Sequence, residues 1–391
     1  MNSAILLILS LLSCCLTTWA QPYGKKMLVV IDSLPVKQAM EDWNTITGED
    51  ISDYVVIRDK DSLKQLGSPE LDAIMYLFTK AYRSRPDSLK RIPSRKQMVY
   101  KNSSWYLNDT LYSGPYIDYY NSGRIQNEGT LLYGKVNGPL TLYYKSGAVR
   151  SVWNLENGVR HGPWREYYKN GALRLAKNMH YGRLNGVEEI FYLNGQPVYE
   201  RKYKNATPHD TLIVYFSTGK IREMRLIKNG ITVSSKKELE RNQLSIQFRD
   251  ALFNQDLKAA NKSFYKIWLL DSTNIDTYYK EGLLLASELR FEEAIERFDR
   301  VLQIEPFQMN AVLERGLSRL KKYHPSFQKH NIKEKKELFL TPEAFNHVPD
   351  YELKLICEDL VLADELDATE STIKRIVSEQ IFTYCRNVLG R

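Results

Sequence analysis

The 24 residues GPWREYYKNGALRLAKNMHYGRLN, positions 162–185, decide the fold, because their pattern recurs every 24 residues between Gly114 and Val233 without an insertion or a deletion. Each copy places an aromatic pair at the same offset and a glycine three residues behind that pair. The five pairs are Tyr119-Tyr120, Tyr143-Tyr144, Tyr167-Tyr168, Phe191-Tyr192 and Tyr215-Phe216. A fixed internal period of this length predicts a repeat architecture.

One repeat has the pattern of a β-hairpin. Residues 164–168 are rich in strand formers and lead into Asn170-Gly171, which can supply the positive φ angles of a tight turn. Residues 173–179 return as the second strand, and Tyr181-Gly182 begins a wider turn into the next repeat. Because a lone hairpin is only marginally stable in water, we expect the hairpins to stack side by side in a single-layer antiparallel sheet.

Two columns of apolar residues are expected to form the buried stripe of this sheet. The first column is Leu131, Leu155, Met179, Tyr203 and Ile227, and the second is Ile125, Val149, Leu173 and Ile221, with Pro197 as its one departure. Within each aromatic pair, neighbouring side chains point to opposite faces, so one ring packs inward and the other lines the exposed face. Asp210 stands where a further repeat glycine would lie.

The G-P-x-x-x-Y-Y-x-x-G pattern, as in residues 162–171, resembles the MORN family in its bacterial variant form. The resemblance covers the middle third of the chain and implies the stacked hairpins. Bacterial proteins with these repeats are often labelled as antitoxin components of toxin-antitoxin pairs. An antitoxin-like neutralising role in the cytoplasm is therefore one function that the resemblance implies.

The N-terminus predicts export. Residues 4–12 form a nearly unbroken apolar run, and Thr18-Trp19-Ala20 is a small-x-small cleavage site. Together they predict a signal peptide over residues 1–20. In a second interpretation, Leu11-Leu12-Ser13-Cys14 is a lipoprotein box and Cys14 is lipidated. We expect the mature protein in the periplasm or associated with the outer membrane.

Residues 24–82 predict a small α/β domain, because strands alternate with helices. The strands are expected over 27–31, 54–57 and 74–79, and the helices over 36–43 and 62–66. The run Val29-Val30-Ile31-Asp32-Ser33-Leu34-Pro35-Val36 and the strand that ends in Thr79-Lys80 resemble the plug domain of TonB-dependent outer-membrane receptors. The resemblance implies a plug-like fold and docking to envelope machinery.

A basic stretch with two prolines follows this domain. Residues 83–104 are predicted to be a linker, and the hairpin repeats are expected over 105–233. A charged joint over 234–242 then leads to a helical domain over 243–391.

The helical domain resembles TPR repeats. The resemblance rests on Tyr278, Gly282, Leu285, Phe291, Ala294, Phe298 and Pro306. It implies pairs of antiparallel helices, and Gly316 repeats Gly282 34 residues later to open a third pair. Helices over 351–362 and 370–388 are expected to close the stack. Cys357 and Cys385 lie on these two helices, where they form a disulfide or remain buried free thiols.

Recognisable catalytic motifs are absent from the sequence. It contains no Walker loop, GxSxG, HExxH or GxGxxG motif after a strand, and its six histidines are scattered. We therefore expect no enzyme activity, no cofactor and no metal site. The repeats over 114–233 contain 17 Lys and Arg against 9 Asp and Glu, so the sheet is expected to be basic.

These patterns predict a multi-domain α+β protein that acts as an exported, non-catalytic scaffold or protein-protein interaction protein of the bacterial cell envelope. The expected protein-binding surface is the concave groove of the TPR-like pairs, lined by Tyr279, Leu283, Leu313 and Leu317. In an alternative, Arg165 and Lys169 on the basic aromatic sheet bind anionic envelope glycans or lipid headgroups. No nucleic-acid partner is expected.

Overall fold

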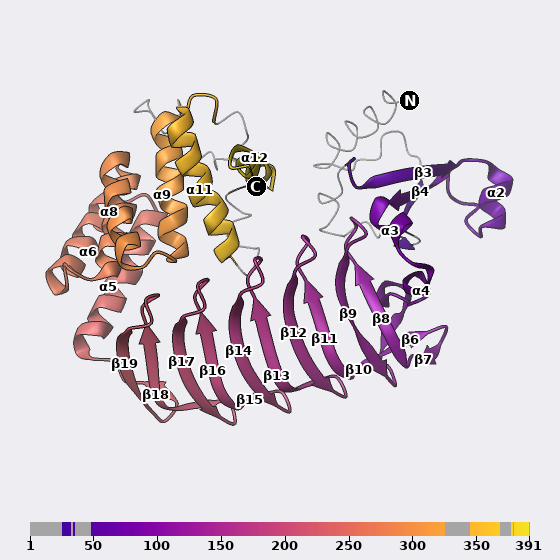
Figure 1. Ribbon diagram of the computed structural model, residues 1–391, viewed down its shortest axis with the longest axis horizontal. Helices are drawn as coiled ribbons and strands as arrows, with labels where there is room; N and C mark the ends of the chain where they lie inside the picture. Colours follow the sequence, from indigo (N-terminus) through magenta and orange to yellow (C-terminus); the bar gives the residue numbers. More distant parts are fainter. Residues whose placement is uncertain are drawn as a thin grey trace. The chain divides into compact units, whose positions relative to one another are not determined.

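Figure 1 shows the computed structural model, which describes residues 26–32, 34–35, 48–324, 345–367, 377 and 379–390. The chain divides into two compact units, residues 1–162 and residues 163–391. Unit 1 contains the N-terminal α/β module and the first repeats, and unit 2 contains the later repeats and the long helices.

The α/β module of unit 1 is a four-stranded sheet with the strand order β2-β1-β4-β3. Its strands are β1 (Met27–Ile31), β2 (Leu34–Pro35), β3 (Ile51–Ile57) and β4 (Ala73–Thr79), with helices α2 (Lys60–Gln65) and α3 (Lys80–Ser84). β1 is parallel to β4, and β3 is antiparallel to β4. The three predicted strands and the second predicted helix are confirmed. The helix predicted over 36–43 lies outside the described residues.

Asp32 and Thr79 bring the first repeat turn against this module. The buried carboxylate of Asp32 accepts hydrogen bonds from the Thr79 backbone N–H at 2.8 Å and from the Thr79 hydroxyl at 2.6 Å. Burial raises the pKa of Asp32, and the two hydrogen bonds from Thr79 oppose that shift. A Cβ on Gly123 would lie 2.1 Å from Oγ1 of Thr79, so the turn can approach only because position 123 is a glycine.

Residues 83–104, predicted to be a linker, instead fold onto the first repeat. This region contains α4 (Asp87–Lys90), η3 (Arg95–Gln97) and β5 (Val99–Lys101), and it leads into β6 (Ser104–Leu107) and β7 (Thr110–Leu111). Arg95 forms an ion pair with the buried Asp118 at 2.8 Å, and Met98 packs in one core cluster with Tyr116. The basic composition and the two prolines predicted a linker, but the ion pair between Arg95 and Asp118 holds this segment against the first hairpin.

The repeats form sequential antiparallel strands. In unit 1 they are β8 (Gly114–Tyr119), β9 (Ile125–Leu132), β10 (Lys135–Val136), β11 (Gly138–Tyr143) and β12 (Val149–Glu156), and β13 (Val159–Tyr167) runs across the unit boundary. Unit 2 continues with β14 (Leu173–His180), β15 (Arg183–Leu184), β16 (Gly186–Phe191), β17 (Pro197–Lys204), β18 (Thr207–Tyr215), β19 (Ile221–Lys228) and β20 (Ile231–Thr232). The order β14-β16-β17-β18-β19-β20 confirms the predicted stacking of hairpins.

The two ends of each hairpin use different turns. Gly171 has a φ of +87°, as predicted, and its N–H donates to the Tyr168 carbonyl at 2.9 Å. Asn170 does not share this positive φ, so the prediction of two positive angles was wrong there. The two-residue turn with positive φ at both positions lies at the other end, where Tyr181 has 43° and Gly182 has 79°. Asp210, with a φ of 69°, takes the left-handed conformation of the repeat glycines.

Tyrosines at the second position of the aromatic pairs form a hydrogen-bonded ladder in unit 2. The buried Tyr168 hydroxyl donates to the Phe191 carbonyl at 2.7 Å, and the Tyr192 hydroxyl donates to the Tyr215 carbonyl at 3.0 Å, each 23 residues onward. The ladder ends at Phe216, which has no hydroxyl and belongs to the last repeat. The inward position predicted for one ring of each pair is therefore confirmed for these tyrosines.

The predicted apolar columns are buried unevenly. In the first column, Leu131 and Ile227 are buried and the other three residues are half-buried. In the second column, Ile221 is 55% exposed, so the prediction of a continuous second stripe was wrong. Ile221 opens β19, the second strand of the last repeat, and the described residues contain no further hairpin repeat after it.

The helices of unit 2 are α5 (Lys236–Phe253), α6 (Leu257–Leu270), α7 (Ile275–Ser287), α8 (Phe291–Ile304), α9 (Met309–Tyr323), α11 (Asp350–Leu366) and α12 (Glu379–Val388). Figure 1 shows them stacked beside one another in unit 2. α5 begins inside the predicted joint because Ser235 and Glu238 form a capping box. A Cβ on Gly282 would lie 2.6 Å from the Phe298 ring, which confirms the predicted close approach of α7 and α8.

Candidate functional site

The predicted groove is filled by the chain itself. Leu313 and Leu317 on α9 are only 3% and 5% exposed. They share one core cluster with Ile356 and Leu360 of α11 and with Phe382 of α12. The prediction that Leu313 and Leu317 line an open binding groove was therefore wrong, because these leucines are part of the core that the last two helices complete.

Tyr279 and Leu283 on α7 are half-buried and pack against the same cluster. The Tyr279 ring lies 6.0 Å from the Phe298 ring, measured between centroids. Burial raises the pKa of Tyr279 well above its ordinary value, so its phenol stays protonated. Both side chains contribute to the contact between helices rather than to a free surface.

Two buried aspartates fasten α11 to its neighbours. Asp359 accepts hydrogen bonds from Arg315 at 2.5 Å and from Arg319 at 2.7 Å, and burial raises the pKa of its carboxyl while Arg315 opposes that shift. Asp364 forms ion pairs with Lys169 at 2.5 Å and Arg386 at 2.8 Å. α11 is therefore joined by charge to α9, to α12 and to a repeat turn.

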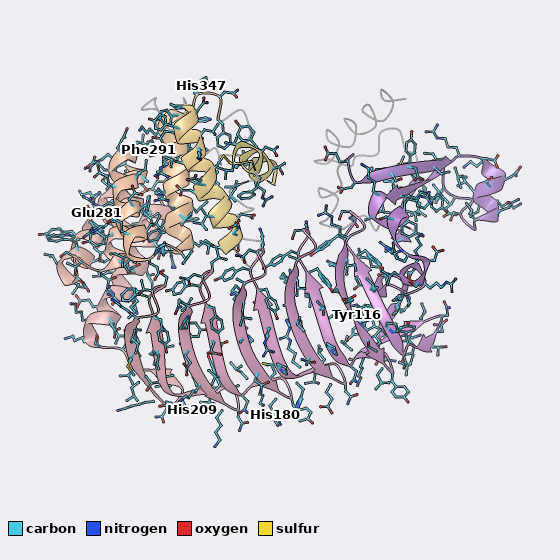
Figure 2. All side chains as sticks on the ribbon, in the orientation of Figure 1. Tyr116, His180, His209, Glu281, Phe291 and His347 are labelled. Atoms are coloured by element: carbon cyan, nitrogen blue, oxygen red, sulfur yellow. A yellow bond between two sulfur atoms is a disulfide. The ribbon has the colours of Figure 1, made fainter. Side chains whose placement is uncertain are left out.

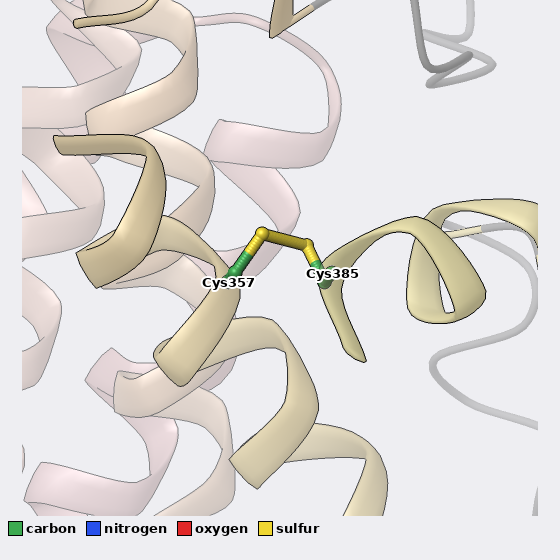
Figure 3. Close-up of a disulfide and its surroundings, with 2 residues drawn as sticks. All are labelled: Cys357 and Cys385. Carbon is green, nitrogen blue, oxygen red and sulfur yellow. A yellow bond between two sulfur atoms is a disulfide. The ribbon is translucent and has the colours of Figure 1, made fainter. Parts of the chain in front are cut away.

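A disulfide fixes α12 to α11. Cys357 of α11 and Cys385 of α12 are bonded, with their Cα atoms 4.8 Å apart, as Figure 3 shows. The sequence left the disulfide and the free thiols as alternatives, and the structure decides for the disulfide. Because both cysteines are fully buried, the bridge lies inside the closed end of the helical stack.

Lys169 and Arg165 have separate roles. Lys169 lies in the Tyr168 to Gly171 turn, and its side chain is only 16% exposed because it pairs with Asp364. Lys169 therefore anchors the repeat turn to α11. The prediction that Lys169 binds anionic glycans or lipid headgroups was wrong, because its charge is already paired with Asp364. Arg165 remains exposed on β13, as predicted. The two side chains do not form one site.

Much of the positive charge of the unit 2 sheet is matched by acidic and aromatic neighbours. Arg174 forms an ion pair with Glu166, and the Lys177 ammonium lies 3.9 Å above the centroid of the Trp164 ring. Glu188 accepts a hydrogen bond from the Tyr199 hydroxyl at 3.0 Å. Burial is the larger cause that raises the pKa of Tyr199, and the negative charge of Glu188 is the next. Counting residues therefore overestimates the free positive charge of the sheet.

The outer face of α6 is the surface that sequence reasoning missed. Ala260 and Ile267 are buried on the inner side of this helix, packed against α5. On the opposite side, Tyr265, Trp268 and Leu269 are 60%, 44% and 61% exposed, and the Tyr265 and Trp268 rings stack 6.3 Å apart. Three exposed lysines flank them, namely Lys258, Lys262 and Lys266. We call these six residues the α6 outer face.

The α6 outer face combines two kinds of contact. Its aromatic rings offer large apolar area at low conformational cost, which is typical of residues that dominate protein interfaces. Its lysines lie on a helix with no acidic residue between Leu257 and Leu270. Such a face can hold an apolar side chain of a ligand while the lysines attract neighbouring negative charge.

The described residues offer no group of three or more His, Cys, Asp or Glu side chains that could hold a metal ion. Figure 2 shows His180 and His209 at the end of the unit 2 sheet that lies away from the helices. In the same described part of the chain, none of the helices has the length and apolarity that a membrane crossing requires.

A comparison with protein-family models supports the assignment of the hairpin repeats. A family model described as a MORN repeat variant matches residues 160–178 and 184–205. The TPR2B domain of yeast Sti1, solved in its pHsp70 complex, is similar with 13% identity and a TM-score of 0.25, over 38% of this chain and 98% of that chain. No curated protein sequence matches the chain. The chain thus contains repeats similar to the MORN repeat variant, followed by a helical region.

Proposed function

We propose that this chain is an exported, non-catalytic interaction protein of the bacterial cell envelope, and that the α6 outer face binds its protein partner. The observation that carries the proposal is the exposure of the stacked Tyr265 and Trp268 beside Leu269, on a helix whose opposite side is buried. Contiguous exposed aromatic and aliphatic side chains of this kind mark interaction sites. The groove residues of α9 are already covered by the chain itself.

The partner presents an acidic segment with an apolar side chain. Lys258, Lys262 and Lys266 are exposed around the aromatic residues, so the segment that binds there carries Asp or Glu next to its apolar anchor. The rings supply the contact area, and the lysines favour encounter with the acidic partner and exclude basic ones.

The sheet of unit 2 supports the helical stack to which α6 belongs. Lys169 reaches Asp364 of α11, and Tyr192 reaches Glu305 at the end of α8, so two successive repeat turns are bonded to the helical stack. The hairpins therefore act as a support that holds the helices in one orientation within unit 2. A scaffold needs such a support because a partner that is held must also be positioned.

The test is affinity capture from envelope fractions with a double variant, Tyr265→Ser with Trp268→Ser. We expect the partner that the wild-type chain retains to be lost, because the variant removes the apolar contact. The matched control is Tyr351→Ser, which removes an aromatic ring that is 66% exposed on α11. Equal retention by wild type and the double variant would contradict the proposal.

The envelope glycan or lipid alternative is favoured by one observation, the free exposure of Arg165 on the sheet. Arg165→Ser would then weaken envelope retention more at low salt than at high salt, because screening removes the wild-type contact. An antitoxin-like role requires the chain in the cytosol, so cell fractionation separates it from both envelope functions.

A further inference from the structure

The first helix of the helical stack is apolar on two opposite sides. One side, with Leu244, Phe248 and Ala251, is buried in a core cluster that includes residues of α6. The other side exposes three apolar side chains to solvent, and they are Leu239, Ile246 and Phe253, at 59%, 51% and 81%. We call these three residues the α5 stripe. A helix that packs on one side only normally carries polar residues on the other side, so the α5 stripe is typical of a second contact surface.

The α5 stripe has the spacing of a contact between two helices. Its residues lie seven positions apart, so they follow nearly one line along α5, with about 10.5 Å between neighbours. A second α-helix offers side chains at the same interval, whereas one face of a β-strand offers them about every 7 Å. The surface therefore fits a helix of about four turns.

The charges beside the stripe are complementary to a second copy of the same helix. Lys236 and Asp250 lie on one flank of the stripe, with Gln243 midway between them. The exposed Lys236 side chain has no hydrogen bond or ion pair within the described residues. In the same part of the chain, the Asp250 carboxylate pairs only with Arg249, at 3.6 Å, and the two side chains are 61% and 74% exposed. Because such an exposed pair contributes little, both Lys236 and Asp250 can bind another charge.

We propose that α5 pairs with α5 of a second copy of this chain, antiparallel and about a two-fold axis at Gln243. In this register Lys236 of each copy lies at the level of Asp250 of the other, on the same flank of the pair. The stripe closes at the same time, because Leu239 of each copy lies within one residue of the level of Ile246 of the other.

Phe253 extends past the start of the other copy's α5 in this register. In each chain, the segment before α5 also exposes apolar side chains, since Ile231 and Val233 are 70% and 48% exposed. These two residues lie at the end of the pair that Phe253 reaches, where they offer its ring an apolar neighbour. The pairing thus covers all three residues of the α5 stripe.

Other registers are less favourable. A parallel pair brings the two Arg249 side chains together in the seam, where like charges repel. An antiparallel pair centred on Ile246 matches the stripe residue for residue, but it leaves Lys236 opposite no acidic residue of α5. The charges of Lys236 and Asp250 therefore select the register centred on Gln243.

Charge reversal tests this pairing. Lys236→Glu and Asp250→Lys each place like charges at the same level, so each variant alone is expected to weaken self-association by about ten-fold. An equimolar mixture of the two variants restores opposite charges at both positions and should recover the wild-type affinity as a heterodimer. Sedimentation velocity of the full chain measures both results. Self-association that neither variant changes would overturn the proposal.

A second pair of variants tests the stripe itself. Ile246→Lys should abolish self-association, because it puts a charge into the apolar contact. The matched control is Gln247→Lys at the next position of α5, which is exposed outside the stripe and should leave association unchanged. Both changes lie at exposed positions, so circular dichroism should show the same folding for both. A wild-type chain that is monomeric at about 100 μM would overturn the proposal, and so would a mixture of the charge variants that stays monomeric.

Discussion

The Tyr192 hydroxyl lies 2.9 Å from the carboxylate of Glu305, and this contact joins the fourth hairpin to the end of α8 inside unit 2. The Ser217 N–H reaches the same carboxylate at 3.3 Å, so one buried acid receives hydrogen bonds from two successive repeat turns. Removing Glu305 therefore affects the support of the helices, although it lies far along the chain from either turn.

Glu305→Ala should lower the free energy of unfolding by about 1 to 3 kcal/mol, because it leaves the buried Ser217 N–H without its acceptor and removes one of the two acceptors of the Tyr192 hydroxyl. Chemical denaturation followed by circular dichroism measures this change. The control is Glu240→Ala on the exposed surface of α5, which should alter stability by less than about 0.5 kcal/mol. Equal effects of the two variants would show that the Glu305 contacts contribute little.

Gly123→Ala should destabilise the protein more than Gly171→Ala. Both glycines have positive φ, at +79° and +87°, so alanine is strained by a similar amount at each. Only Gly123 faces a neighbour, since its new Cβ would meet the Thr79 hydroxyl, whereas nothing lies within 4 Å of Gly171. We expect a further loss of about 1 to 3 kcal/mol for Gly123→Ala, measured by thermal unfolding.

The Cys357 to Cys385 bridge should stabilise the helical end of unit 2 by about 2 to 4 kcal/mol, because it closes a loop with a sequence separation of 28. A reducing agent should lower the melting temperature of the wild-type chain. Cys385→Ala should melt at a temperature near that of the reduced wild type and should not respond to the reducing agent. A melting temperature that is the same with and without reducing agent would show that the bridge adds no stability.

Alkaline pH should destabilise the repeats. Burial raises the pKa of Tyr116 to about 12, and burial together with Glu128 raises the pKa of Tyr143 to about 12. The folded chain therefore holds these protons more tightly than the unfolded chain. The resulting stabilisation is complete below a pH of about 10 and is lost as the pH rises toward 12. Denaturant unfolding at increasing pH, with tyrosinate absorbance as the second signal, measures the loss.

The 24-residue period predicted the strands well, because each repeat contains its own turn residues and its own alternation of inward and outward side chains. The tight turns were misplaced. Asn170-Gly171 has the stronger local signal, but the aromatic ladder fixes a longer turn there, and the non-glycine Tyr181 adopts the positive φ at the opposite end. The local sequence correctly predicted that a turn lies at Asn170-Gly171. The type of turn depends on contacts between hairpins, which the local sequence does not contain.

The binding groove predicted on α9 is buried, and the exposed apolar surface lies on α6 instead. Leu313 and Leu317 have apolar side chains that either a partner or the chain could cover, and only the packing of α11 decides between these possibilities. The α6 outer face could have been found from the sequence. Once Ala260, Phe264 and Ile267 are placed inward, helical geometry puts Tyr265 and Leu269 on the opposite side.

Photo-crosslinking from two tyrosine positions tests the central claim most directly. A photoreactive amino acid replaces Tyr265 on the α6 outer face in one variant and the half-buried Tyr279 in the other, and both are expressed in cells. We predict a crosslink to a protein partner from position 265 and none from position 279. A partner crosslinked from position 279 but not from position 265 would contradict the assignment of the α6 outer face as the binding surface.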